Sequence, residues 1–178
     1  MRALRVIAAG VVCALLALLV WDVAHNSGGK VASDVDKGRI VKAPAFNLPR
    51  VTGNGKLSLA SLRGKVVVVN FWASDCVPCK DEQAELNKTA AKWADKGVVF
   101  LGIDEVEVRS FAQKYLQHYK VPYLSVADAD AAIAGKFGVT GTPETFFIDR
   151  RGRVVPPHIV SIAKPADLEA GIRRALSA

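Results

Sequence analysis

The hydrophobic and polar positions along the chain predict alternating strands and helices from about residue 46 onward. Two apolar runs, 66–72 and 98–103, lack every-second-residue alternation, so we expect them to be central strands that are covered on both faces. Shorter strand patterns follow at 46–48, 123–126, 145–148 and 154–162. Pro156-Pro157 interrupts the last of these. Because proline cannot donate to a strand ladder, this pair predicts an edge or bulged strand.

Helical spacing occurs between these strands. Steps of four and three place five positions on one face of a predicted helix: Cys79, Gln83, Leu86, Ala90 and Trp93. The same periodicity predicts a second helix from Val108, Phe111, Ala112, Tyr115 and Tyr119. A short helix is expected near 130–137, and a closing helix follows Pro165. Strands that alternate with helices and end in a hairpin predict an α/β fold with a mixed sheet.

The N-terminus predicts an export segment. An uncharged apolar run, 6–21, follows Arg2 and Arg5, and the positive-inside rule therefore places the N-terminus in the cytoplasm. The run is shorter than the roughly 20 residues that span hydrocarbon easily. A small-x-small cleavage site is missing, however, so we favour an uncleaved anchor over a cleaved signal peptide. In either case the remainder of the chain is exported.

These patterns divide the chain into three parts. Residues 1–24 are expected to form one N-terminal membrane-anchor helix. Residues 25–42 are polar, contain Gly28-Gly29 and lack apolar periodicity, so we expect a flexible tether. Residues 43–178 are expected to form one domain on the extracytoplasmic side of the membrane.

Composition fits an ordinary globular domain. The chain has 178 residues, of which 51% are hydrophobic and 23% are charged, which excludes a disordered or fibrous protein. The net charge is +7, but the basic residues are scattered and form no basic helix face. We therefore expect no nucleic-acid partner.

Two cysteines, Cys76 and Cys79, lie where the first central strand gives way to a helix. A helix N-terminus carries unpaired N–H groups and partial positive charge, which stabilise a thiolate on Cys76. This thiolate can attack a partner disulfide, and Cys79, one turn along on the inward face, can resolve the mixed disulfide. Pro78 is tolerated because first-turn N–H groups have no intrahelical partner.

Other roles for the cysteine pair are less favoured. A zinc site needs further ligands, and the candidates, which are Cys13, His25, His118 and His158, do not lie at metal-ligand spacing. A structural disulfide across two residues would constrain little chain entropy. We therefore expect a redox pair that needs no metal and no cofactor.

Two motifs resemble a known family. Residues 66–82, with the sequence VVVVNFWASDCVPCKDE, are similar to the active-site segment of the TlpA/ResA/CcmG (DsbE-like) thioredoxin-like proteins. Residues 138–149, with the sequence GVTGTPETFFID, resemble the proline loop of that family, and the likeness extends over roughly 43–176. The resemblance implies a thioredoxin fold, a central mixed sheet flanked by helices, with an N-terminal β extension.

The resemblance also implies roles near the cysteines. Cys76 would be the attacking thiol and Cys79 the resolving thiol. Glu82 matches an acidic residue that tunes the thiols or relays a proton. Asn70 stands where ordinary thioredoxins carry a buried aspartate. One departure from the family pattern is Asp75, which stands where these proteins usually have a tryptophan. The carboxylate of Asp75 would disfavour a thiolate on the neighbouring Cys76.

A substrate groove is implied by the second motif. Pro143 would be the cis-proline beside the disulfide, and the backbone of Thr142 would bond an extended substrate segment. Trp72 and Pro78 would line the same surface. The expected activity is thiol–disulfide exchange, chiefly reduction of protein disulfides. Apocytochrome c is a candidate substrate, and a DsbD/CcdA-type membrane protein is the candidate electron donor.

Two alternatives remain open. A thiol peroxidase of the peroxiredoxin (AhpC/TSA) type would need a proline and a threonine ahead of the first cysteine, where this chain has Val69 and Ala73. A non-enzymatic thioredoxin-fold module could instead hold a polypeptide, or deliver haem through His118 or His158. Neither histidine lies in a haem-attachment motif.

Overall fold

The computed structural model describes residues 13, 15–17 and 29–178. The predicted anchor helix at 1–24 lies outside this part of the chain, apart from four residues. Within the described ranges, no helix combines the length and apolar character that crossing a membrane requires.

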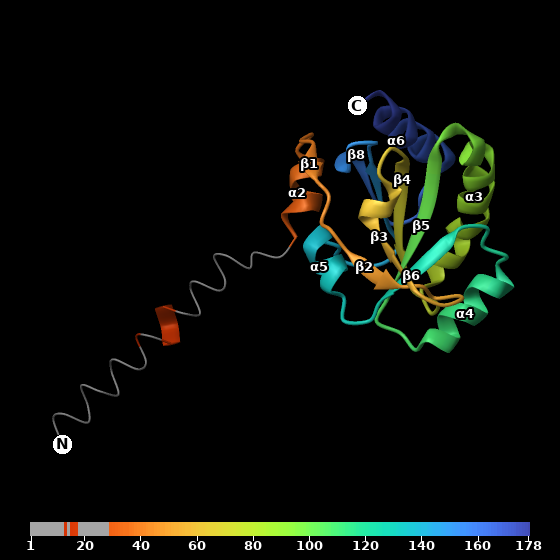
Figure 1. Ribbon diagram of the computed structural model, residues 1–178, viewed down its shortest axis with the longest axis horizontal. Helices are drawn as coiled ribbons and strands as arrows, with labels where there is room; N and C mark the ends of the chain where they lie inside the picture. Colours follow the sequence, from red (N-terminus) through yellow and green to blue (C-terminus); the bar gives the residue numbers. More distant parts are fainter. Residues whose placement is uncertain (1–12, 14, 18–28) are drawn as a thin grey trace, which may run out of the picture.

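A six-stranded mixed sheet forms the centre of the domain (Figure 1). In their order across the sheet, the strands are β1 (Val41–Lys42), β8 (Arg153–Val160), β7 (Glu144–Ile148), β4 (Val66–Trp72), β5 (Val98–Glu105) and β6 (Leu124–Asp128). Strands β4, β5 and β6 are parallel, and β7 is antiparallel to both β4 and β8. A separate two-stranded sheet pairs β2 (Asn47–Pro49) with β3 (Lys56–Ser58). The predicted thioredoxin fold, with its N-terminal β extension, is confirmed.

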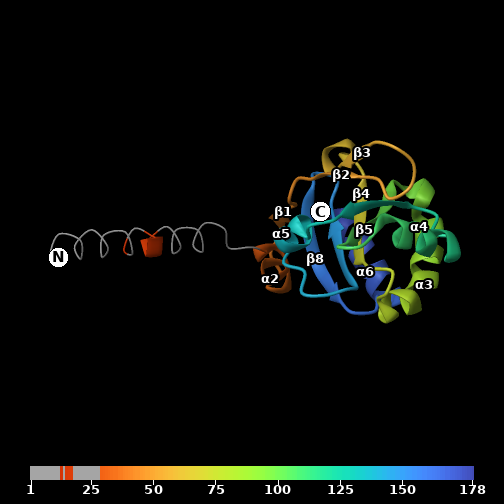
Figure 2. The same ribbon diagram turned by 90° about the horizontal axis from the view of Figure 1, so that it is seen from below.

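Helices cover both faces of the sheet. They are α2 (Lys30–Asp36), α3 (Val77–Trp93), α4 (Arg109–His118), α5 (Ala132–Phe137) and α6 (Pro165–Ser177), with short 3-10 turns at Leu59–Leu62 and Ala94–Lys96. Figure 2 shows α3 and α6 below the sheet and the β2–β3 pair above it. Helices α2 and α5 pack into the same apolar cluster as β3. The layers are therefore α3 and α6 on one side and α2, α5 and the β2–β3 pair on the other.

The central strand β4 is buried along its whole length, as its unbroken apolar run predicts. Val66 and Val68 contact the cluster that α3 and α6 supply. Val67 and Val69 face the opposite cluster. Because side chains alternate across a strand, a strand between two helical layers needs apolar residues at every position.

The predicted face of α3 is also confirmed, since all five of its positions are buried. The predicted face of α4 is partly wrong. Ala112 and Tyr115 are buried, but Val108 and Phe111 are more than half exposed. Helix α4 packs around Trp72 and Cys79 at the end of the sheet rather than across it. Its N-terminal turn therefore has no layer to bury it.

The proline pair lies in a bulged strand, as expected. The register between β7 and β8 shifts between Thr145 and Phe147, opposite the segment that contains Pro156 and Pro157. The bond between the two prolines is cis. Strand β1 pairs only with Arg153 and Val154, so among the described residues the remainder of β8 has no strand partner on its outer edge.

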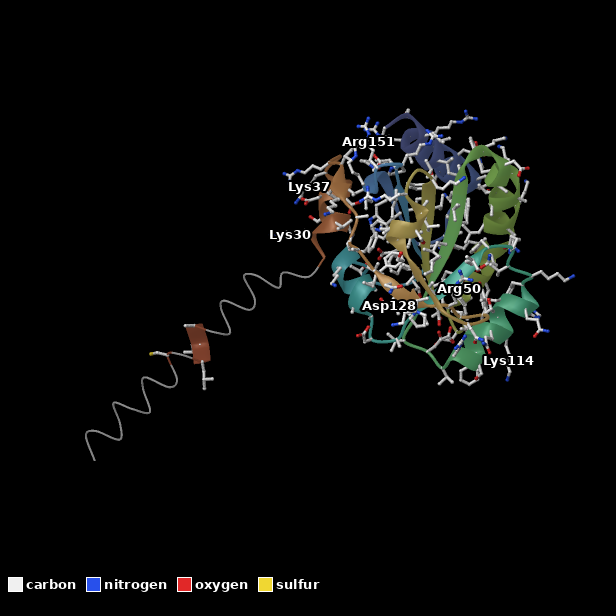
Figure 3. All side chains as sticks on the ribbon, in the orientation of Figure 1. Lys30, Lys37, Arg50, Lys114, Asp128 and Arg151 are labelled. Carbon is white, nitrogen blue, oxygen red and sulfur yellow. A yellow bond between two sulfur atoms is a disulfide. The ribbon has the colours of Figure 1, made fainter. Side chains whose placement is uncertain are left out.

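The prediction of a flexible tether is wrong for the described residues from 29 to 42, because they form a helix and a strand that pack on the domain. Lys30–Asp36 form helix α2, whose Ala32 and Val35 are buried against the core, and β1 joins the main sheet. Lys30 and Lys37 mark the two ends of this helix in Figure 3. A seven-residue helix with three apolar residues, Val31, Ala32 and Val35, gives too little periodicity to recognise in sequence, and packing against the sheet supplies its stability.

Candidate active site

The two cysteines form a disulfide at the start of α3, with an S–S distance of 2.01 Å. Cys76 is the N-cap residue, and its Sγ accepts a hydrogen bond of 3.1 Å from the backbone N–H of Cys79. Cys76 is partly exposed, whereas Cys79 is 1% exposed. The predicted division into an outer and an inner cysteine is confirmed. The same N–H group and the helix dipole would stabilise a thiolate on the outer sulfur.

An aromatic pair lies behind the inner cysteine. The rings of Trp72 and Tyr115 stack with centroids 4.5 Å apart, and the Tyr115 hydroxyl donates to the carbonyl oxygen of Cys79 at 3.0 Å. Burial raises the pKa of Tyr115 well above its ordinary value, so the hydroxyl stays protonated as a donor. Trp72 is only 2% exposed. It therefore supports the disulfide from inside the domain, which corrects the expectation that Trp72 lines the substrate surface.

Glu82 lies one turn after Cys79, fully buried. Asn70 donates to its Oε1 at 2.8 Å, and the backbone N–H of Ala163 donates to its Oε2 at 2.6 Å. Burial raises the pKa of Glu82 to about 6, although these two hydrogen bonds act in the opposite direction. A buried carboxyl group that titrates near neutrality can gain and lose a proton at physiological pH.

The proline loop leaves the sheet at the same edge as the cysteines. The Thr142–Pro143 bond is cis, as predicted. Glu144, the next residue, pairs with Phe71 on β4, and β4 ends one residue later at the start of the disulfide loop. Thr142 is half-buried and Pro143 is buried. The disulfide loop and the proline loop, which are distant in sequence, are therefore brought to one end of β4 and β7.

An acidic hollow lies beside the disulfide loop. Its volume is about 370 Å³, and it is lined by Ser74, Asp75, Glu105, Val106, Glu107 and Phe111. The N–H and hydroxyl groups of Ser74 both donate to the Glu107 carboxylate. Burial, followed by the charges of Asp128 and Glu144, raises the pKa of Glu105 to about 7. Asp75 is exposed at the rim of this hollow.

Of the carboxylates at this hollow, the sequence analysis identified Asp75 but not Glu105 or Glu107. Asp104, which interacts with Glu107, is 1% exposed, and its Oδ1 has no hydrogen-bond partner among the described residues. Burial, with the hydrogen bond and charge of Glu107, raises the pKa of Asp104. A signal was present, since acidic residues follow two parallel strands, β5 and β6, whose carboxyl ends share one edge of the sheet. Arg50 and Asp128 lie toward this end of the domain in Figure 3.

These features define a thioredoxin-fold protein with a disulfide at its active site. They are the mixed sheet, the disulfide at the N-terminus of the helix after the central strand, and the cis-proline loop at the same edge of the sheet. Comparisons with known proteins agree. The AhpC/TSA family matches residues 41–156. The chain therefore belongs to the AhpC/TSA family, and within it to the group that contains the DsbE and ResA proteins.

Individual relatives carry these names. The chain is 46% identical over 110 residues to the thiol:disulfide interchange protein DsbE of Pseudomonas fluorescens biotype C, which covers 61% of this chain and 60% of that protein. It is 33% identical to the thiol-disulfide oxidoreductase ResA of Bacillus thuringiensis, over 69% of this chain and 71% of that protein. A crystal structure of a thiol:disulfide interchange protein of the thioredoxin family from Chlorobium tepidum superposes with a TM-score of 0.67 at 30% identity, covering 77% of this chain and 97% of that one. The chain thus spans about 60% of the length of the Pseudomonas relative.

Proposed function

We propose that this protein is a thiol–disulfide oxidoreductase that reduces disulfides in partner proteins through Cys76 and Cys79. The observation that carries the proposal is the cysteine pair itself, with one sulfur partly exposed at a helix N-terminus and the other buried one turn further along. The names of the relatives in its family support the same activity.

Reduction of a partner disulfide takes place in two thiol–disulfide exchange steps. The Cys76 thiolate of the reduced protein attacks one sulfur of a partner disulfide, which forms a mixed disulfide and releases a partner thiolate. The Cys79 thiolate then attacks the sulfur of Cys76, which releases the second partner thiolate and leaves the Cys76–Cys79 disulfide. Two electrons pass to the partner, and its two thiolates take up two protons. Reduction by a further dithiol is needed before the next cycle.

Three neighbouring groups would assist these steps. Glu82 would tune the thiols or relay a proton, because its carboxyl group is buried and titrates near neutrality. The backbone of Thr142 and the ring of Pro143 would hold an extended substrate segment against the disulfide. Pro78 would contribute to the same surface.

The partner proteins and location are proposed on chemical grounds. A disulfide persists in oxidising compartments, and the N-terminal apolar run with Arg2 and Arg5 before it predicts a membrane anchor with its N-terminus in the cytoplasm. The domain would then act outside the cytoplasm. Apocytochrome c, whose haem-attachment cysteines must be reduced, is a suitable substrate. A membrane electron donor of the DsbD/CcdA type is a suitable reductant.

Thiol peroxidase chemistry is the alternative enzyme within this family. Val69, which occupies the position of the expected proline, is buried in the core, and Ala73 supplies no hydroxyl group. The chain therefore lacks the threonine hydroxyl group that would donate a hydrogen bond to a peroxide at Cys76. Replacing both cysteines with serine distinguishes an oxidoreductase from a non-enzymatic binding module. A binding module would still bind its partner after this change, whereas an oxidoreductase would lose its activity.

The test is the equilibrium redox potential of the Cys76–Cys79 pair in the full chain, titrated against glutathione or dithiothreitol with thiol trapping. A potential near the thioredoxin value of about −270 mV is expected for a reductase. A potential near about −120 mV would instead indicate a disulfide donor. A pair that does not cycle would contradict the proposed activity altogether.

A further inference from the structure

A buried histidine on β8 lies between two carboxylates, on the side of the sheet away from strands β5 and β6. The Nε2 atom of His158, on β8, is 2.8 Å from Oε2 of Glu144 on β7, and its Nδ1 atom is 3.1 Å from Oδ1 of Asp36 on α2. The side chains of His158 and Glu144 are 3% and 1% exposed. The imidazole ring also stacks on Phe146, with centroids 4.2 Å apart. The ring orientation is therefore fixed by three contacts, two from β7 and one from α2.

This arrangement favours the charged imidazolium. Only a doubly protonated ring can donate from both nitrogens, and both nitrogens face carboxylates. Burial opposes the charge, but the hydrogen bonds and charges of Glu144 and Asp36 more than compensate, so the pKa of His158 is raised. The same contact, together with the donors described below, lowers the pKa of Glu144 despite its burial. Lys37 lies beside Asp36 in the lining of the hollow described below, and the charge of Glu105 also interacts with that of Glu144.

The second oxygen of Glu144 holds the proline loop. Its Oε1 accepts hydrogen bonds from the N–H and the hydroxyl of Thr140, both at 2.8 Å, and from the N–H of Gly141 at 3.3 Å. These residues lead directly into Thr142 and Pro143. A single carboxylate therefore joins the histidine on one side to the loop on the other.

Helix α2 completes the network from the N-terminal side. Asp36 is its last residue, and the helix forms one wall of a hollow of about 460 Å³ whose lining includes Ser33, Asp36, Thr140 and His158. Gly29 and Gly138 approach each other at its other end, where a Cβ atom on either would overlap the backbone of its neighbour. The helix, the histidine and the loop are thus in continuous contact.

We propose that His158 is a positioning residue for the proline loop, which it holds through Glu144 and connects to the docked helix α2. The proposal rests on the proposed function in one respect, namely that this loop receives the substrate. Neither the helix nor the histidine would touch the reacting sulfurs. The helix and the histidine would instead hold Glu144, which through Thr140 and Gly141 fixes the position of the Thr142 backbone.

The first experiment follows pH in the full chain by NMR. The side-chain nitrogens of His158 and the backbone amide protons of Thr140 and Gly141 are titrated together, in a Glu105→Gln background that removes the neighbouring carboxyl group that interacts with Glu144 and titrates near pH 7. We expect the two amides to move with the same midpoint as the ring, above pH 6.5. Asp36→Asn should lower both midpoints together. The matched control is Asp34→Asn, which removes a carboxylate from the same helix that pairs with Arg39, and it should change neither midpoint.

Two outcomes would overturn the proposal. The first is that the amides titrate with a midpoint different from that of the His158 ring. The second is that Asp36→Asn shifts the midpoint of the ring but leaves that of the amides unchanged. This readout does not depend on catalysis, so it stands or fails separately from the proposed function.

The second experiment measures activity in His158→Phe, which keeps an aromatic ring against Phe146 but removes both hydrogen bonds. We expect kcat/KM toward a disulfide-bearing polypeptide to fall by about tenfold, the usual effect of one hydrogen bond to a charged group. Exchange with dithiothreitol, which needs no proline loop, should be unchanged. Equal losses with both substrates would show a general structural role and contradict the proposal. If this variant does not fold, the Asp36 and Asp34 variants still decide the question.

Discussion

At the scale of single residues, the environment of each buried side chain determines its protonation. Glu82 and Glu144 are both buried acids, yet the pKa of the first is raised and that of the second is lowered. Glu82 receives one amide and one backbone donor, which do not compensate for its burial. Glu144 faces a histidine and three donors, which do. The first is therefore suited to exchange protons and the second to hold a loop.

Replacing Glu82 with glutamine tests its part in exchange. Wild-type kcat/KM should show an inflection near pH 6, where the carboxyl group ionises, and E82Q should lack this inflection. We expect a loss of about tenfold or more at pH 7, a modest effect for a proton-transfer group. The measurement is the pH profile of polypeptide disulfide reduction. An unchanged profile would show that Glu82 serves only in packing.

The two cysteines should differ in what they trap. Cys79→Ser leaves the exposed nucleophile but removes the resolving thiol, so a mixed disulfide through Cys76 should accumulate with a partner. Cys76→Ser should form none, because Cys79 is buried. Non-reducing electrophoresis and mass spectrometry of the trapped species would check this. Equal trapping by both variants would contradict the division of roles.

At the scale of elements, helix α3 and helix α2 arise in different ways. The face of α3 is apolar over several turns, and Cys76 caps its start, so local sequence specifies it. Helix α2 is one short element with no side-chain cap, and its buried residues are supported by α5 and β8. Its docking requires two glycines, Gly29 and Gly138, to approach closely with positive φ angles.

Gly138→Ala tests this contact. The added Cβ would overlap the carbonyl of Gly29, in addition to the backbone cost at φ +80°. The matched control is Gly38→Ala, since Gly38 has φ +78° at the other end of α2 and no atom within 4 Å. We expect Gly138→Ala to reduce the free energy of unfolding by about 1–3 kcal/mol more than the control does. Urea denaturation gives both values, and equal losses would exclude a tight α2–α5 contact.

At the scale of the whole molecule, the buried titratable groups give stability a dependence on pH. The folded-state pKa of Glu82, about 6, lies above its unfolded value, so stability is lost as pH rises from 4.5 through 6. The raised pKa of His158 acts in the same direction at higher pH, with its contribution complete below 6.5 and lost as pH rises through the folded value. Glu144 acts in the opposite direction, and its contribution is lost as pH falls below 4.5.

The Glu82 contribution can be isolated by difference. Between pH 4 and pH 8, the free energy of unfolding of E82Q relative to wild type should change in favour of E82Q by about 2 kcal/mol, the equivalent of its raised pKa. Urea titrations of both proteins at several pH values would measure this change. A difference that is constant with pH would show that Glu82 does not titrate as its burial implies.

The sequence by itself determined the elements whose information is local. The all-apolar run of β4, the periodic face of α3 and the cysteine pair between them follow from residues that are neighbours in sequence. The cis bond at Pro143 was predicted from a motif resemblance. In each case one segment of chain carries the whole pattern, because strand and helix periodicity repeat within a few residues.

Only the tertiary structure decided the contacts between distant segments. Asp36 and His158 are 122 residues apart, and Glu82 meets Ala163 across 81 residues. No pattern in sequence marks such partners, because each residue alone is an ordinary polar position. Likewise, Trp72 lies inside the domain because α4 covers it, and α2 is a docked helix because β8 and α5 support it. Burial and pairing depend on which surfaces the sheet brings together, and they set both the pKa values of the site and the position of its proline loop.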